Sequence, residues 1–314
     1  MIGSMVQYSV WGNCCNSCDF CLRRDRTVHT KQQQIQNINN IIENIGYVDW
    51  KNKFNYGISL LGGELYFVTD KDVQKSFMGL IDVIINKIIK VSENPNCMYS
   101  SVTNGIYEPS FLFRVIDKIR DEVGINHVDL NFSYDLKYRF KTEENRKLVI
   151  ENINKFHERY NYKTGVQMIL TQYLINLVKE KKFDVNDFLK NTIPGNALSF
   201  LYPHPVHTGK KLDDFFFKRS DLLWFVKYLR DNNGEVYKNF LYSTRNSGTF
   251  KYTGFKYRDK NKINSDRIDQ QPVLSDGKEK INPKCGHSVL YQCYSDCDKC
   301  MLCDLQFIDS DIRY

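Results

Sequence analysis

The sequence lacks any run of about 18 apolar residues, so a membrane span is not expected. The stretch Met1–Val6 also lacks a basic segment followed by a long apolar one, and a secretory signal is therefore not predicted. No internal repeat is present. The chain has ten cysteines, and without a signal those clustered at two places in the sequence are expected to be metal ligands in a reducing cytoplasm and not disulfides. These absences together predict a cytoplasmic protein with no membrane partner.

The charge of the chain is only mildly one-sided. The formal net charge is +7 over 314 residues, and lysine and arginine are spread along the whole sequence. A distributed basic surface is more typical of solvated side chains than of a nucleic-acid site. With 42% hydrophobic residues, the chain is long enough for one barrel-sized domain plus an appendage.

Short apolar runs alternate with longer segments of helical periodicity. This alternation predicts an α/β fold built from parallel βα units. Strands are expected at Gln7–Trp11, Tyr56–Leu61, Met98–Thr103, His127–Ser133, Gly165–Thr171 and Ala197–Tyr202. Helices are expected at Lys31–Ile45, Asp72–Val91, Ser110–Glu122, Glu143–Tyr160, Val178–Leu189 and Asp221–Leu229.

The most informative feature is a loop of three cysteines directly after the first expected strand. Cys14, Cys18 and Cys21 have the spacing C-x3-C-x2-C. Structural iron–sulfur sites normally have four cysteines, so three thiolates on one loop indicate a cubane cluster with one iron left open. An open metal position is a site for chemistry, as in catalytic zinc sites. Cys97 stands alone and is predicted to be a small buried hydrophobe.

The second expected strand ends at Gly62-Gly63-Glu64. Glycines at the end of a strand let the backbone approach a ligand without a Cβ in the way. In parallel barrels the active site lies at the C-terminal ends of the strands, so this triplet and the cysteine loop are expected at the same edge. Either feature alone is a weaker signal than the two together.

With the residue Phe20 just before the third cysteine, the loop and the Gly-Gly-Glu triplet resemble those of the radical S-adenosylmethionine (SAM) enzymes. The resemblance implies a partial (β/α)6 TIM-like barrel. It also implies a 4Fe–4S cluster on which SAM chelates the open iron and is cleaved to a 5′-deoxyadenosyl radical. A one-electron reductant such as flavodoxin or ferredoxin is implied as a partner.

The resemblance also suggests cofactor-binding residues. Gly62, Gly63 and Glu64 are expected near the amino group of SAM, and Phe20 near its adenine. Ser133 and Asp135, at the end of the fourth expected strand, fit positions that contact the ribose hydroxyls in the family. Two alternatives remain open: a packing role for Phe20 as a plug at the mouth of the barrel, and a capping role for Ser133 and Asp135 before the following helix.

A second group of cysteines lies near the end of the sequence. Its spacing suits an auxiliary 4Fe–4S cluster or a four-cysteine zinc site. The arrangement is similar to the SPASM and twitch extensions of radical SAM enzymes, with one cluster as the better fit. We therefore expect a radical SAM core at residues 1–232 and a small irregular cysteine-rich extension at 233–314. The expected ligands are Cys293, Cys297, Cys300 and Cys303, with Cys285 as an alternative.

Three functions remain open from the sequence. The first is hydrogen abstraction from a peptide or protein, which the cysteine-rich extension favours. The second is the same radical chemistry on a nucleic acid or nucleotide, consistent with the mild basicity and the abundant aromatic residues. The third is a metal-stapled binding protein without turnover, against which the open three-cysteine loop argues.

Overall fold

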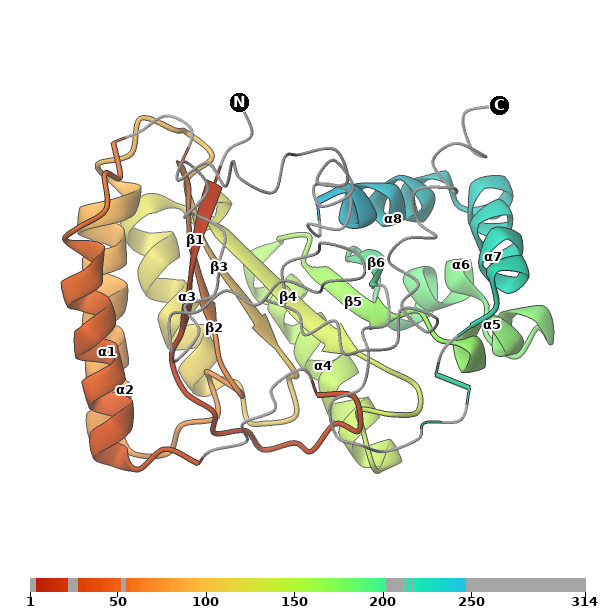
Figure 1. Cartoon of the computed structure of the whole chain (residues 1–314), viewed down its shortest axis with the longest axis horizontal. Helices are drawn as coiled ribbons and strands as arrows, with labels where there is room; N and C mark the ends of the chain where they lie inside the picture. Colours follow the sequence, from red (N-terminus) through yellow and green to blue (C-terminus); the bar gives the residue numbers. More distant parts are fainter. Residues whose placement is uncertain are drawn as a thin grey trace, which may run out of the picture.

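The computed structural model describes residues 4–21, 28–51, 55–201, 212, 214–215 and 217–246. Their strands form one parallel sheet of six strands in the order β1-β2-β3-β4-β5-β6, an open, partial TIM-like barrel (Figure 1). The predicted α/β fold of six βα units is therefore confirmed. The strands are β1 (Ser4–Ser9), β2 (Asn55–Leu61), β3 (Met98–Thr103), β4 (Val128–Tyr134), β5 (Gly165–Ile169) and β6 (Ala197–Leu201).

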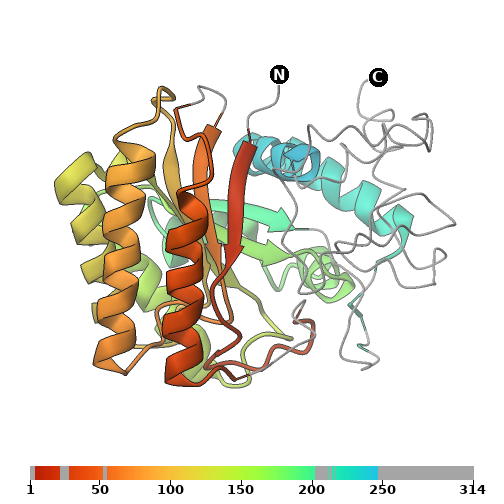
Figure 2. The same ribbon diagram turned by 60° about the vertical axis from the view of Figure 1, so that its left-hand side comes forward.

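Helices follow the strands and cover one face of the sheet, with α1 and α2 packed side by side (Figure 2). The α-helices are α1 (Lys31–Ile45), α2 (Lys71–Ile84), α3 (Ser110–Val123), α4 (Glu143–Tyr160), α5 (Gln172–Lys179), α6 (Val185–Asp187), α7 (Arg219–Asn232) and α8 (Gly234–Asn246). Shorter helical segments are η1 (Ile85–Ile89), η2 (Ile125–His127) and η3 (Phe188–Thr192).

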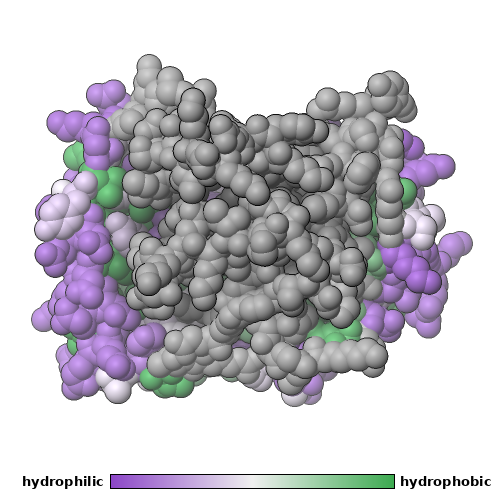
Figure 3. Space-filling model, viewed as in Figure 1, coloured by the Kyte–Doolittle hydropathy of each residue, from purple (hydrophilic) through white to green (hydrophobic). Residues whose placement is uncertain are grey.

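Local capping explains why two helices have the predicted bounds. The Thr30 hydroxyl accepts from the backbone N–H of Gln33 at 3.3 Å, and the Gln33 side chain accepts from the Thr30 N–H at 2.8 Å. This reciprocal capping box fixes the start of α1. Thr142 caps α4 in the same position by accepting from Asn145 N–H at 3.2 Å. The outer surface over α1 and α2 is mainly hydrophilic (Figure 3).

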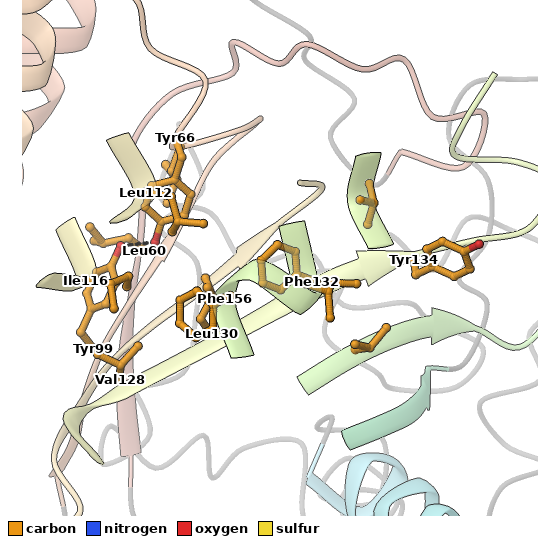
Figure 4. Packing of buried hydrophobic residues seen from close by; sticks show 14 of the residues in the cluster. Leu60, Tyr66, Tyr99, Leu112, Ile116, Val128, Leu130, Phe132, Tyr134 and Phe156 are labelled. Atoms are coloured by element: carbon orange, nitrogen blue, oxygen red, sulfur yellow. Dashed lines mark hydrogen bonds between the residues drawn. The ribbon is translucent and has the colours of Figure 1, made fainter. Parts of the chain in front are cut away.

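The main core lies between the sheet and the helices. Leu60, Leu130 and Phe132 point toward the helices and are almost fully buried (Figure 4). Phe132 meets Phe156 of α4 edge to face, with ring centroids 6.1 Å apart. Alternate residues of a strand face opposite sides of the sheet, so Val128, Leu130, Phe132 and Tyr134 of β4 all belong to this core. Cys97 is 1% exposed and belongs to it too, as predicted.

The opposite face of the sheet is polar at its centre. Ser59 pairs with Ser100 and Ser100 with Asp129 in the strand register, so their side chains share this face. The Ser100 hydroxyl donates to Asp129 Oδ2 at 2.9 Å, and the side-chain amide of Asn131 donates to Oδ1 at 2.9 Å. The inner wall of the barrel therefore presents hydrogen-bonding groups where the helix-facing side presents hydrocarbon.

The helix expected at Val178–Leu189 was wrong. Thr171 caps the backbone N–H of Leu174 at 3.2 Å, so α5 begins immediately after β5. The chain then leaves the helix at Lys181, which has a positive φ of 56°. Asp184 accepts from Asp187 N–H at 2.8 Å and starts a second short helical segment, α6 and η3. The single apolar periodicity in this region therefore spans two helices.

Helix α8 has no counterpart among the predicted elements. Its Val236 and Phe240 are 1% exposed, and it packs against β6, where the Asn239 amide donates to the Leu198 carbonyl at 3.3 Å. The structured part thus continues beyond residue 232 to residue 246. Residues 247–314 lie outside the described part, so the division into a core and a cysteine-rich extension stays a prediction. Within the described residues, none of the helices is both long and apolar enough to cross a membrane.

Candidate cofactor and metal site

The cysteine loop and the Gly-Gly-Glu triplet lie against each other at the C-terminal edge of the sheet. The loop follows β1 and the triplet follows β2. The backbone N–H of Gly63 donates to the Trp11 carbonyl at 2.9 Å, and the N–H of Glu64 donates to the Asn13 carbonyl at 2.7 Å. The indole N–H of Trp11 donates back to the Glu64 carbonyl at 3.2 Å. The two segments that the sequence singled out are thus joined by backbone hydrogen bonds.

Gly63 is required by the closeness of this contact. A Cβ at Gly63 would lie 2.1 Å from the carbonyl oxygen of Asn13 and 2.4 Å from that of Gly12. These are backbone atoms and cannot swing aside as a side chain would. A Cβ at Gly62 would instead meet the end of the Leu65 side chain at 2.5 Å. Gly63 therefore sets how closely the base of the cysteine loop approaches the end of β2.

The carboxylate of Glu64 is buried and hydrogen-bonded within the protein. It is 1% exposed, accepts from the backbone N–H of Asn104 at 2.7 Å and accepts from the Thr103 hydroxyl at 2.8 Å. Burial raises the pKa of Glu64 to about 7, although these hydrogen bonds oppose the increase. The side chain therefore ties the end of β2 to the end of β3 beneath the cysteine loop.

The two neighbouring thiols at the start of the loop differ in acidity. A hydrogen bond from Cys15 lowers the pKa of the Cys14 thiol to about 6, and the same bond raises the pKa of Cys15. The backbone N–H of Asn16 also donates to the Cys14 sulfur at 3.4 Å, and the Asn104 amide does so at 3.6 Å. Because the thiolate is the metal-binding form, these contacts favour Cys14 over Cys15 as a ligand.

The three thiols with the predicted spacing differ in their exposure to solvent. Cys14 is exposed, Cys18 is buried and Cys21 is intermediate. Burial raises the pKa of Cys18. The Asn16 side-chain amide donates to the Cys18 sulfur at 3.5 Å while its backbone N–H holds Cys14, so one residue contacts both sulfurs.

The donor set of the loop fits an iron–sulfur cluster in kind and position. Three thiols on one loop at the active edge of a parallel sheet are suitable ligands for such a cluster. In the described part of the chain, however, no three His, Cys, Asp or Glu side chains are arranged to hold a metal ion. Cluster binding would therefore require Cys14, Cys18 and Cys21 to converge.

Phe20 is buried among other side chains beside this loop. It is 5% exposed and stacks on Phe215, with ring centroids 5.7 Å apart. The Arg139 guanidinium lies over the Phe20 ring at 5.0 Å. Phe20, Cys18, Tyr138 and Phe215 form a small hydrophobic cluster separate from the main core. The structure therefore shows Phe20 packed beside the cysteine loop, and a contact of its ring with an adenine stays a prediction.

Ser133 and Asp135 lie at the end of β4, where they were expected, and are both buried. Asp135 Oδ1 accepts from the backbone N–H groups of Lys137 at 2.8 Å and Arg139 at 2.9 Å, and also from that of Tyr138. Asp135 thus caps the turn that follows β4. Any contact of these two side chains with a ribose stays a prediction.

Sequence reasoning missed Asn16 and Arg139 as members of this site. Both lie close to Cys18, but Arg139 is far from it in sequence, and no spacing or periodicity marks such a contact. Asn104, directly after β3, also belongs to this site, because its side-chain amide contacts Cys14 and its backbone N–H contacts Glu64. The expected ligands Cys285, Cys293, Cys297, Cys300 and Cys303 lie outside the described residues.

Comparisons with solved structures show distant likeness. Streptococcus suis SuiB bound to precursor peptide SuiA is 14% identical, with a TM-score of 0.47 over 73% of this chain and 46% of that one. A structure of anSMEcpe with bound AdoMet and the Cp18Cys peptide is 15% identical, with a TM-score of 0.48 over 72% of this chain and 59% of that one. A second anSMEcpe structure with AdoMet is 16% identical, with a TM-score of 0.46, covering 72% and 60%.

The chain thus spans between 46% and 60% of the length of these structures. No family model and no curated protein matches the chain. At this level of likeness, none of these structures indicates what the chain binds or modifies.

Proposed function

We propose that this chain is a radical SAM enzyme that abstracts a hydrogen atom from a peptide or protein. The observation that carries the proposal is the position of the three-cysteine loop: its start is hydrogen-bonded to the backbone of Gly63 and Glu64 at the C-terminal edge of a parallel six-stranded sheet. Three ligating thiols leave one iron of a cubane open.

In this function Cys14, Cys18 and Cys21 would hold the cluster. When bound, a 4Fe–4S cluster with SAM on its open iron would supply a 5′-deoxyadenosyl radical. Gly63 lets the backbone at the end of β2 lie close to the cysteine loop, and Glu64 holds the ends of β2 and β3 together next to it. The role of the protein is then to position the loop, exclude water around Phe20 and present the polar inner wall to the substrate.

The peptide class is favoured by the cysteines near the end of the sequence, whose spacing is similar to that of the SPASM and twitch extensions of radical SAM enzymes. A one-electron reductant such as flavodoxin or ferredoxin is part of the proposal.

Anaerobic reconstitution followed by dithionite and SAM tests the chemistry. Wild type is expected to release 5′-deoxyadenosine, and the triple change of Cys14, Cys18 and Cys21 to Ala is expected to abolish the release. Cys97→Ala is the matched control, because this thiol is buried in the main core, and it should retain activity. A wild-type protein that binds iron but releases no 5′-deoxyadenosine would instead support a non-catalytic metal-stapled binding protein.

Salt dependence separates the two substrate classes. A protein that binds nucleic acid through phosphates loses affinity steeply between about 50 and about 200 mM salt. We expect labelled single-stranded DNA and RNA to show no such salt-sensitive binding. If they do, the nucleic-acid or nucleotide reading replaces the peptide one.

We further propose an auxiliary 4Fe–4S cluster on Cys293, Cys297, Cys300 and Cys303, with Cys285 as the alternative ligand. Changing the four cysteines to Ala should remove about four irons per chain, as for a four-iron cluster. Loss of zinc with unchanged iron would show a structural zinc site instead.

A further inference from the structure

The loop between β4 and α4 is fastened to the cysteine loop along its length. The backbone N–H of Asp19 donates to the Tyr138 carbonyl at 3.1 Å, and the Asn16 side-chain amide donates to the Arg139 carbonyl at 3.0 Å. An ion pair joins Lys141 to Asp19 at 2.9 Å. The two loops therefore form one unit, although they are far apart in the sequence.

The Arg139 side chain points into this unit toward a cysteine sulfur. Its Nη1 lies 3.7 Å from Cys18 Sγ, and its guanidinium covers the Phe20 ring at 5.0 Å. The Asp135 carboxylate accepts a hydrogen bond from the backbone N–H of Arg139 at 2.9 Å, which fixes the position of the Arg139 backbone. Arg139 Nε is buried and has no hydrogen-bond partner among the described residues.

A buried guanidinium N–H without an acceptor costs free energy, because its bond to water is lost and not replaced. A sulfur bound to iron would be an acceptor for it. The other cations of this loop are engaged elsewhere: Lys141 pairs with Asp19, and Lys137 lies over the rings of Tyr138 and Tyr173 at 5.2 and 4.6 Å. Arg139 is the cation that the loop directs at Cys18.

We propose that Arg139 is a positioning and charge-setting residue for a cluster held by Cys18, with its guanidinium donating to sulfur and raising the reduction potential. The inference rests on the proposed function, since it needs a cluster on this loop. Hydrogen bonds and positive charge at the sulfurs stabilise the reduced, more negative form of a cluster. Removing the charge should therefore make reduction harder.

The test is a redox titration of the cluster signal that disappears in the triple Ala variant of Cys14, Cys18 and Cys21. Arg139→Gln is expected to lower the midpoint potential by about 59 mV or more, a tenfold change for a one-electron couple. Arg139→Lys, which keeps the charge without the planar fork, should shift it less. Lys137→Gln is the matched control: it removes the same charge from the same loop but leaves Cys18 untouched, and the potential should stay at the wild-type value.

SAM affinity and thermal unfolding complete the design. If Arg139→Gln weakens SAM binding while the potential stays at the wild-type value, Arg139 is a cofactor contact and the inference is overturned. If Arg139→Gln unfolds at a lower temperature, the folded Arg139→Lys variant decides: a shift in potential smaller than that of Arg139→Gln supports the role of charge, and a shift as large as that of Arg139→Gln overturns it. Absence of a cysteine-dependent cluster in wild type would refute the proposed function itself, a result distinct from a cluster whose potential ignores Arg139.

Discussion

The Glu64 carboxylate is linked to the Cys14 sulfur through a single residue, Asn104. The backbone N–H of Asn104 donates to Glu64 at 2.7 Å, and its side-chain amide donates to Cys14 at 3.6 Å. Glu64 also accepts a hydrogen bond from the Thr103 hydroxyl, and the oxygen of that hydroxyl lies 2.6 Å from the Tyr107 hydroxyl oxygen. A buried acid of the Gly-Gly-Glu triplet therefore supports the cysteine loop from below.

This burial predicts a pH-dependent stability. The pKa of Glu64 rises from its usual 4.5 to about 7 because of desolvation, so the folded chain binds the proton more tightly than the unfolded chain. The stability this gives is fully present below about 4.5 and is lost as the pH rises through about 7, on the order of 3 kcal/mol in all. Glu64→Gln should remove that part of the slope in urea unfolding of the metal-free 314-residue chain.

Glu151→Gln is the control for this measurement. Glu151 lies on the exposed side of α4, so removing its charge should leave the slope between pH 4.5 and 7 as in wild type. An unchanged slope in Glu64→Gln would show that the buried carboxylate does not titrate with folding.

Substitutions of two glycines test how closely the cysteine loop approaches β2, with Gly63 at the contact and Gly79 as the control. Gly63→Ala places a methyl group 2.1 Å from the Asn13 carbonyl oxygen, so we expect a loss of about 1–3 kcal/mol in the free energy of unfolding. The loop should also take up less iron on reconstitution. Gly79→Ala in α2 meets nothing within 4 Å and should gain about 0.5–1 kcal/mol, because alanine is a better helix former. Equal effects of the two changes would contradict the close contact.

Local signals in the sequence predicted the elements that begin with a cap or end with a turn. Helices α1 and α4 have the predicted bounds because Thr30 and Thr142 cap them. The region after β5 was misassigned because the helix periodicity continues across Lys181, where the backbone breaks. Helix α8 is stabilised by packing on β6. The polar residues around Gly234 give no local signal for this tertiary contact, so the helix was not predicted.

Only those parts of the site that follow from the spacing of residues along the sequence could be predicted. The cysteine spacing and the triplet located two loops that do meet, at Gly63 and Trp11. The direction of the Glu64 carboxylate, toward Asn104, depends on how β2 and β3 pair. The contact of Arg139 with Cys18 joins residues far apart in the chain and follows from the path of the loop after β4. Neither could be predicted from local pattern.

Substitutions of Asp135 separate its capping role from a role in binding a ribose. Asp135→Ala removes the acceptor for three backbone N–H groups, so we expect a loss of about 1–3 kcal/mol in the free energy of unfolding. Asp135→Asn keeps Oδ1 and should retain most of the stability. If the carboxylate also contacts ribose hydroxyls, the Asn variant should bind SAM more weakly while unfolding nearly as wild type does.

Asp231→Ala, an exposed carboxylate of α7, is the control for that experiment and should change neither stability nor SAM binding. Wild-type SAM affinity in Asp135→Asn would limit Asp135 to its capping role.

The acidity of Cys14 predicts how fast it reacts in the metal-free chain. With a pKa of about 6, Cys14 is mostly thiolate at pH 7, and being exposed it should react rapidly with iodoacetamide. The rate should fall as the pH drops through about 6, because the sulfur becomes protonated. Cys15→Ala removes the hydrogen bond that contributes most to this low pKa, so at pH 7 the Cys14 rate should fall several-fold and recover only at higher pH. Cys15→Ser keeps a donor at that position and should react nearly as fast as wild type. Rates are followed by mass spectrometry with fragment assignment, and equal rates at pH 7 in wild type and Cys15→Ala would show that the neighbouring thiol does not select Cys14 as the ligand.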